Sequence, residues 1–223
     1  MKWINKLERK YGRYGIRNLM QFIVLGNALI FLLMQMDPRI PSLLAMHPAL
    51  VMQGEVWRLI SFIFIPPTTS LFFAFFVLYF YYMVGTGLEH EWGTFKFNVF
   101  YLAGILGTVI ASFITGSVAN AVYINMALFL GFARIYPDYQ ILLMLILPIK
   151  VKYLAWLNWG IIGFNLIFGT FPVKIMSLVP VALYLLFFGG ELSTDVKRQR
   201  QIQQNRKRFF SEIEKAKKNQ KRE

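Results

Sequence analysis

The stretch GEVWRLISFIFIPPTTSLFFAFFVLYFYYMVGTGLEHEWGTFKFNVFYLAGILG, residues 54–107, decides the fold of this chain. It begins in a loop that carries a Trp-Arg pair, runs through a long apolar segment, turns at a glycine-rich polar segment and enters a second apolar run. Each run approaches the roughly 20 residues that a helix needs to cross the hydrocarbon core of a bilayer. The stretch therefore predicts two membrane-spanning helices joined by a short turn.

The composition extends this interpretation to the whole chain. Of 223 residues, 57% are apolar and 17% are aromatic, and the mean hydropathy is +0.49, which is too apolar for an ordinary soluble domain. We expect six spans, at about residues 19–36, 71–87, 95–116, 119–136, 153–170 and 173–190. The predicted fold class is an all-α membrane protein, with one six-helix domain at 19–190 between an N-terminal flank (1–18) and a C-terminal tail (191–223).

The distribution of charge predicts the orientation. The chain has 24 Lys and Arg against 11 Asp and Glu, and six of these cations lie in residues 1–18 and eleven in residues 191–223. Because cations gather on the cytoplasmic side of membrane proteins, both termini are predicted to be cytoplasmic, which agrees with an even number of spans. The chain has no cysteine, which excludes disulfides and thiol chemistry.

The two basic termini have two interpretations each. Residues 1–18 alternate apolar and basic side chains at helical spacing, which favours either an amphipathic helix on the inner membrane surface or a solvated flank. The tail, 191–223, either binds anionic lipid headgroups or only enforces the orientation. No base-stacking or recognition motif accompanies the charge, so nucleic acid is not an expected partner.

Two motifs in the opening stretch carry structural information. Trp57 and Arg58 lie where an outer loop meets the membrane, so the indole suits the interface while the guanidinium reaches phosphate or backbone carbonyls. The turn between the two spans contains a distinctive set of residues: Gly85, Glu89, Trp92 and Gly93. It also holds two carboxylates around one histidine, but a single imidazole favours a structural turn over a metal site. We expect no metal and no cofactor.

Together these motifs resemble the rhomboid family over about residues 19–190. In that family a Trp-Arg pair anchors the first loop in the outer leaflet, and a Gly-x-x-x-Glu-x-x-Trp/Leu-Gly turn joins helices 2 and 3. The stretch from Tyr136-Pro-Asp138 to Trp156 is similar to a pattern of many bacterial rhomboids. The resemblance implies a six-helix bundle, a glutamate that ties helix ends together, and a bacterial plasma membrane location.

The residues that rhomboid proteases use for catalysis are missing. Those enzymes use a serine on helix 4 and a histidine on helix 6, and matching the tyrosine of their helix 4 to Tyr123 places Ala119 at the nucleophile and Asn120 at the following glycine. Residues 173–190 contain no histidine. Because a buried serine needs a base within hydrogen-bond reach, no catalytic residues are predicted.

Several polar residues at membrane depth leave two interpretations open. Asn120, Tyr123 and Tyr184 are candidates to line a polar cavity that remains from an active site, whereas asparagines elsewhere favour hydrogen bonds between helices. Apolar packing beside Ala119 would favour a scaffold.

The function implied by the resemblance is that of an inactive rhomboid pseudoprotease, as in derlins, which keep the Trp-Arg loop without the dyad. Such a protein binds transmembrane segments of client proteins, or perturbs the bilayer locally. The alternatives are an active intramembrane serine protease with a non-standard site and, third, a lipid or solute transporter, for which no inverted repeat is present. The sequence carries no signal for an oligomeric state.

Overall fold

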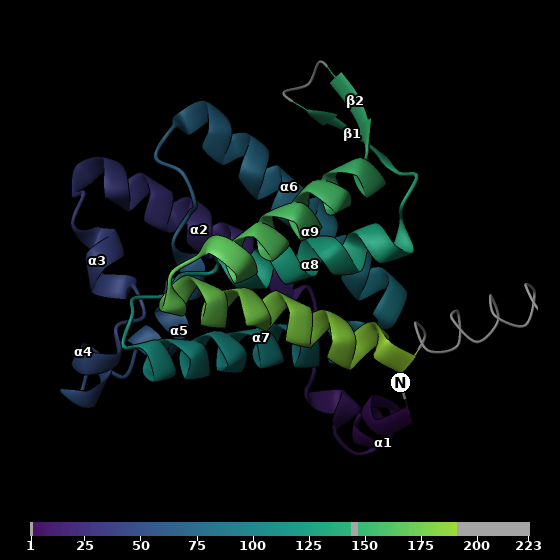
Figure 1. Ribbon diagram of the computed structural model, residues 1–223, viewed down its shortest axis with the longest axis horizontal. Helices are drawn as coiled ribbons and strands as arrows, with labels where there is room; N and C mark the ends of the chain where they lie inside the picture. Colours follow the sequence, from purple (N-terminus) through teal and green to yellow (C-terminus); the bar gives the residue numbers. More distant parts are fainter. Residues whose placement is uncertain (1, 144–146, 191–223) are drawn as a thin grey trace, which may run out of the picture. The chain divides into compact units, whose positions relative to one another are not determined.

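The structure is a computed structural model that describes residues 2–143 and 147–190 (Figure 1). Its elements in chain order are α1 (Lys2–Tyr11), η1 (Gly12–Tyr14), α2 (Leu19–Met36), α3 (Ile40–Leu44), α4 (Pro48–Met52), α5 (Arg58–Ser61), η2 (Phe62–Phe64), α6 (Leu71–Trp92), α7 (Thr94–Thr115), α8 (Val122–Ile135), β1 (Gln140–Leu143), β2 (Leu147–Lys150) and α9 (Val151–Phe168). A further helix covers Phe171–Gly190. The basic tail, 191–223, lies outside the described residues.

Five helices of the described chain are long and apolar enough to cross a membrane: α2, α6, α7, α9 and the helix Phe171–Gly190. They coincide with five of the six spans expected from the sequence. Much of each helix surface faces outward, since only 22–39% of the most apolar part of each is buried inside the protein. Apolar side chains on an outer surface are what a bilayer requires. The placement of both termini in the cytoplasm stays a prediction.

The fourth expected span, at 119–136, forms a shorter helix than the sequence suggested. The apolar run at 119–136 forms the 14-residue α8, about 21 Å long at 1.5 Å per residue, against a hydrocarbon core of about 30 Å. The physical reason lies in the first residues of the run. The backbone N–H and carbonyl of Ala119 both bond to Met46, and a residue paired in this way cannot also join a helical ladder. The helix therefore begins only at Val122.

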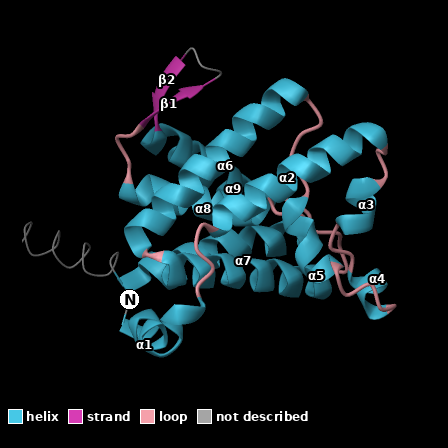
Figure 2. Ribbon diagram, turned by 180° about the vertical axis from the view of Figure 1, so that it is seen from behind, coloured by secondary structure: helices cyan, strands magenta, loops and turns pink. Residues whose placement is uncertain are grey.

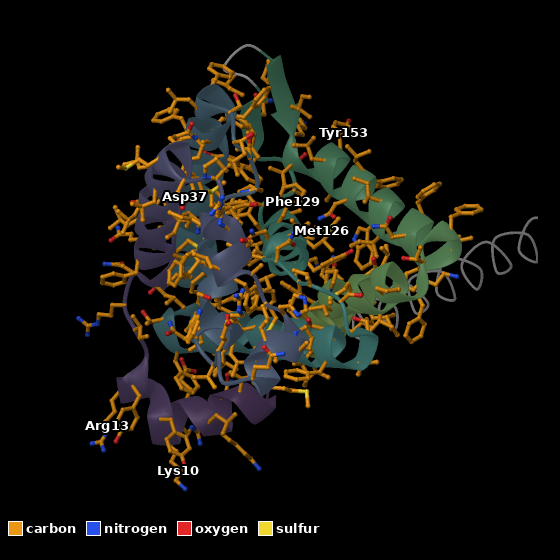
Figure 3. The ribbon with its side chains drawn as sticks, turned by 90° about the vertical axis from the view of Figure 1, so that its left-hand side faces the viewer. Lys10, Arg13, Asp37, Met126, Phe129 and Tyr153 are labelled. Atoms are coloured by element: carbon orange, nitrogen blue, oxygen red, sulfur yellow. The ribbon has the colours of Figure 1, made fainter. Side chains whose placement is uncertain are left out.

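Short as it is, α8 is the central element of the bundle. It contacts α6, α7 and α9, and most of its side chains are buried. Figure 3 shows Met126 and Phe129 of α8 in the middle of the bundle, whereas Tyr153 of α9 lies on the outside. Asn158 of α9 donates from Nδ2 to the carbonyl of Met126 at 3.1 Å, a hydrogen bond between helices of the kind expected for asparagine at this depth.

One segment departs from the all-α expectation. Between the expected spans at 119–136 and 153–170, residues 140–143 and 147–150 form two antiparallel strands in which Gln140 pairs with Lys150 and Leu142 pairs with Pro148 (Figure 2). The run is rich in Ile and Leu and is bounded by Pro137 and by the start of α9. Such short apolar runs are ambiguous between helix and strand when periodicity alone is used.

The N-terminal flank is helical, as one of its two interpretations requires. Ile4 of α1 is fully buried, and Glu8 forms an ion pair with Lys96 of α7 at 3.4 Å, so α1 is docked on the bundle. Lys10 and Arg13 point away from the bundle (Figure 3). Contact of this basic surface with lipid headgroups stays a prediction.

Candidate functional site

The loop between α2 and α6, which the sequence predicts to be an outer loop, is organised by the buried guanidinium of Arg58, which is 3% exposed. Its Nη1 donates to the carbonyl oxygens of Ser42 at 2.7 Å and Ala45 at 2.9 Å, and its Nε pairs with the Glu55 carboxylate at 2.6 Å. Of the two kinds of partner expected for this side chain, phosphate and backbone carbonyl, the structure has carbonyls. Arg58 therefore holds the loop together from within.

The neighbours of Arg58 complete a cap on α3. Nε1 of Trp57 donates to the carbonyl of Leu43 at 3.3 Å, and Oγ of Ser61 donates to the carbonyl of Leu44 at 2.8 Å. Each carbonyl of residues 42–45 thus receives a side-chain donor, where a helix end leaves its last carbonyls without partners. The Trp57 ring remains 54% exposed, which leaves it available for the membrane interface. Anchoring of the loop in the outer leaflet stays a prediction.

Ala119 stands at the position where the resemblance places the nucleophile, and its backbone pairs with the loop between α2 and α6. Ala119 N–H donates to the Met46 carbonyl at 2.9 Å, and Met46 N–H donates to the Ala119 carbonyl at 3.3 Å. Ala119 is 4% exposed and Met46 is fully buried, so apolar packing fills the space on this side. The next residue, Asn120, is exposed and accepts from Val122 N–H at 3.1 Å through Oδ1. It therefore caps the start of α8.

The nearest serine and histidine to this bridge do not form a dyad. His47 follows Met46, and its Nδ1 is buried without a hydrogen-bond partner among the described residues. Ser117 lies two residues before Ala119, but its hydroxyl donates to the carbonyl of Thr115 at 3.4 Å. The only other histidine, His90, is exposed at the far end of α6. A serine without a base as partner is a weak nucleophile.

Tyr123 and Tyr184, the other candidates to line a polar cavity with Asn120, lie on α8 and on the helix Phe171–Gly190. Tyr123 lies in the first turn of α8 and is half-buried. Tyr184 packs edge-to-face against Trp159, with 5.2 Å between ring centroids. An aromatic pair of this kind is a packing contact. A polar cavity shared by the three residues stays a prediction.

The turn between α6 and α7 ties three chain segments together. One carboxylate oxygen of Glu89, Oε1, accepts from Asn18 N–H at 2.9 Å and from the Thr94 hydroxyl at 3.0 Å. Glu89 thereby joins the end of α6 to the starts of α2 and α7, as the resemblance implies for this glutamate. Gly93 adopts φ +84°, a conformation that favours glycine, and allows α7 to begin directly after α6. The Trp92 ring packs on Phe100 with centroids 5.3 Å apart.

We predict that Glu89→Ala loosens the junction between α2 and α6. The change leaves the Asn18 N–H without its acceptor, which costs about 1–3 kcal/mol. The amide of Asn18 should then exchange with deuterium at least tenfold faster, as measured by hydrogen exchange on the purified protein. Glu91→Ala is the matched control, because the partner of Glu91 among the described residues is the Tyr136 hydroxyl, at 3.3 Å, and not a backbone N–H of α2. Equal protection of Asn18 in both variants would contradict the role of Glu89.

The base of the β hairpin carries a small charged cluster. Asp138 pairs with Lys152 at 2.9 Å and with Lys150 at 3.5 Å. The hydrogen bond from Lys152, then the positive charges of Lys152 and Lys150, lower the pKa of Asp138. Partial burial, then the nearby Glu91 carboxylate, raise the pKa of Tyr136. Asp138 therefore stays ionised at neutral pH and holds the two strand ends together.

Sequence reasoning missed several residues that organise these sites. The Ser61 hydroxyl donates to the backbone carbonyl of Leu44, and the backbone of Met46 pairs with that of Ala119. The Asn98 side chain forms two hydrogen bonds with the backbone of Ile16, at 3.1 and 3.0 Å. Asn98 follows the turn motif by five residues, so a polar side chain near the start of an apolar helix was the available signal. No comparable signal marked Met46, because its contact is made by backbone atoms alone.

The fold and these contacts define a multi-pass integral membrane protein. The chain belongs to the family described as "Eukaryotic integral membrane protein (DUF1751)", which matches residues 17–190. No curated protein matches the chain. Because the family is eukaryotic, the bacterial plasma membrane expected from the sequence is not supported.

Proposed function

We propose that this chain is a catalytically inactive, rhomboid-like protein that binds transmembrane segments of client proteins. The observation that carries the proposal is the state of position 119, where alanine replaces a nucleophile and its backbone is paired with the outer loop. A peptide bond cannot be attacked there without an activated side chain. What remains useful in such a fold is recognition within the bilayer.

The surface that suits a client helix is the outer side of α9. The buried residues of this helix, among them Ala155, Asn158 and Ile162, share one face, and the helix packs on α8. Trp159 packs on Tyr184 of the helix Phe171–Gly190. The opposite side is apolar and open: Leu157 and Phe164 are each 62% exposed. Gly160 and Gly163 lie between them, and no described atom would lie within 4 Å of a Cβ added at either position. Small residues on such a face let a second helix approach closely.

Photocrosslinking tests this proposal. With a photoreactive amino acid in place of Phe164, we expect discrete adducts with a small set of membrane proteins. The matched control is the same replacement at Ile110 of α7, which is 58% exposed on another helix and should yield mainly lipid adducts. Lipid adducts alone from both positions would remove the client-binding proposal.

The alternative, an active protease, is favoured by one observation: among the described residues, the buried Nδ1 of His47 has no hydrogen-bond partner, and His47 follows Met46, which pairs with Ala119. The same purified protein treated with a serine-reactive fluorophosphonate separates the two functions. We expect no labelling, because the Ser117 hydroxyl donates to the carbonyl of Thr115 and not to a base in the described part of the chain. Labelling that disappears in Ser117→Ala would establish a non-standard nucleophile and overturn the inactive assignment.

A further inference from the structure

A cavity of about 320 Å³ lies between α6 and strand β1. One wall is an aromatic stripe on α6: Phe72, Phe75, Phe76, Tyr79, Phe80 and Met83. These positions follow the spacing of a single helical face. Residues 139–142 form the opposite wall. The stripe is continuous and apolar, because its one polar group is the hydroxyl of Tyr79.

The stripe is about 16 Å long, because the helix rises 1.5 Å per residue from residue 72 to residue 83. The stripe is also open to its surroundings, since Phe75 is 75% exposed and Tyr79 is 58% exposed. An extended hydrocarbon chain can therefore lie along the helix and enter from the side.

Positive charge lies beside the cavity at the base of the hairpin. Gln140, which lines the cavity, pairs directly with Lys150 across the two strands. Side chains of directly paired residues lie on the same face of a sheet. Lys150 and Lys152 share one carboxylate, that of Asp138, so this cluster of two cations and one anion has a net positive charge. Both lysines are partly exposed, at 41% and 38%.

We propose that this cavity binds one anionic phospholipid, with an acyl chain along the α6 stripe and its phosphate beside Lys150 and Lys152. Contact of the chain with the aromatic rings supplies affinity through van der Waals packing, because no hydrophobic driving force acts between apolar groups inside a membrane. The net positive charge supplies selectivity for an anionic headgroup. The proposal does not depend on client binding, since that function uses the outer side of α9.

Native mass spectrometry of the full-length protein in detergent micelles tests the site. The protein is titrated with phosphatidylserine and with phosphatidylcholine that carry the same acyl chains. We expect one retained lipid per chain, with phosphatidylserine preferred about fivefold, the effect of about one basic charge near a headgroup. No retained lipid of either kind would overturn the proposal.

Variants of the two halves of the site should act differently. Phe76→Trp and Leu142→Trp, from opposite walls, fill the cavity and should weaken both lipids about tenfold, whereas Leu32→Trp on the exposed side of α2 should weaken neither. Two walls are used so that failure of one variant to fold still leaves a test. Unchanged retention in a folded cavity variant would contradict the site.

The charge variant isolates selectivity. Lys150→Gln with Lys152→Gln should abolish the preference for phosphatidylserine and leave phosphatidylcholine unchanged. Arg39→Gln with Lys174→Gln removes two cations that lie outside the cavity and outside both basic termini, and is the matched control, expected to leave the preference intact. An equal loss in both double variants would show a general charge effect and overturn the assigned headgroup position.

Discussion

Arg58→Ala should lower the free energy of unfolding by about 3 kcal/mol. The guanidinium is nearly fully buried, and its removal leaves the carbonyls of Ser42 and Ala45 without donors. It also leaves the Glu55 carboxylate unpaired beside them, although that group is 32% exposed and regains part of its solvation. The midpoint of thermal unfolding in detergent measures the loss.

Two further variants separate the geometry of Arg58 from its charge. Arg58→Lys keeps the positive charge but lacks the planar fork that meets a carboxylate and two carbonyls together, so about half of the loss should remain. Arg39→Ala removes an exposed cation from the same outer loop and should change stability by less than about 0.5 kcal/mol. A loss with Arg39→Ala as large as that with Arg58→Ala would mean that loop charge, not the α3 cap, is what matters.

The Trp57-Arg58 pair illustrates how far the sequence could lead. Its place in a loop between two spans and the hydrogen-bonding capacity of the guanidinium were predictable, because both follow from local sequence and side-chain chemistry. The identity of its partners was not, because Ser42 and Ala45 are reached through backbone atoms, which any residue could supply. Glu89 was more predictable than Arg58, since the family resemblance supplied its role directly.

Two segments differ from the sequence prediction: the helix in the fourth apolar run is shorter than expected, and the segment after it forms a hairpin. Hydropathy indicates whether a segment can lie in lipid, but it does not indicate at which residue a helix begins. In the run at 119–136 the start is set by a backbone bridge from Met46, more than seventy residues earlier in the chain. In residues 140–150 the apolar pattern is equally compatible with helix or strand, and pairing across the turn decides it. Both outcomes depend on contacts that are distant in sequence.

A second large loss of stability is expected when a side chain is added where α2 and α6 cross. A Cβ added at Gly85 would lie 2.7 Å from Cβ and 2.8 Å from Sδ of Met20, and Met20 is fully buried. Atoms so near the backbone of α2 cannot move aside without moving the helix. Gly85→Leu should therefore lower the free energy of unfolding by about 3 kcal/mol, the upper part of the usual range for overpacking. The thermal midpoint in detergent again provides the measurement.

Gly160→Leu is the matched control, because it makes the same chemical change in the middle of another long apolar helix. No described atom would lie within 4 Å of the added Cβ, so the variant should be neutral or up to about 1 kcal/mol more stable through helix propensity. Combining Gly85→Leu with Met20→Ala should cost less than the sum of the two single changes, since the smaller side chain makes room for the larger one. Strict additivity would mean that Gly85 tolerates a side chain by another route, and that close approach of α2 and α6 is not what this glycine provides.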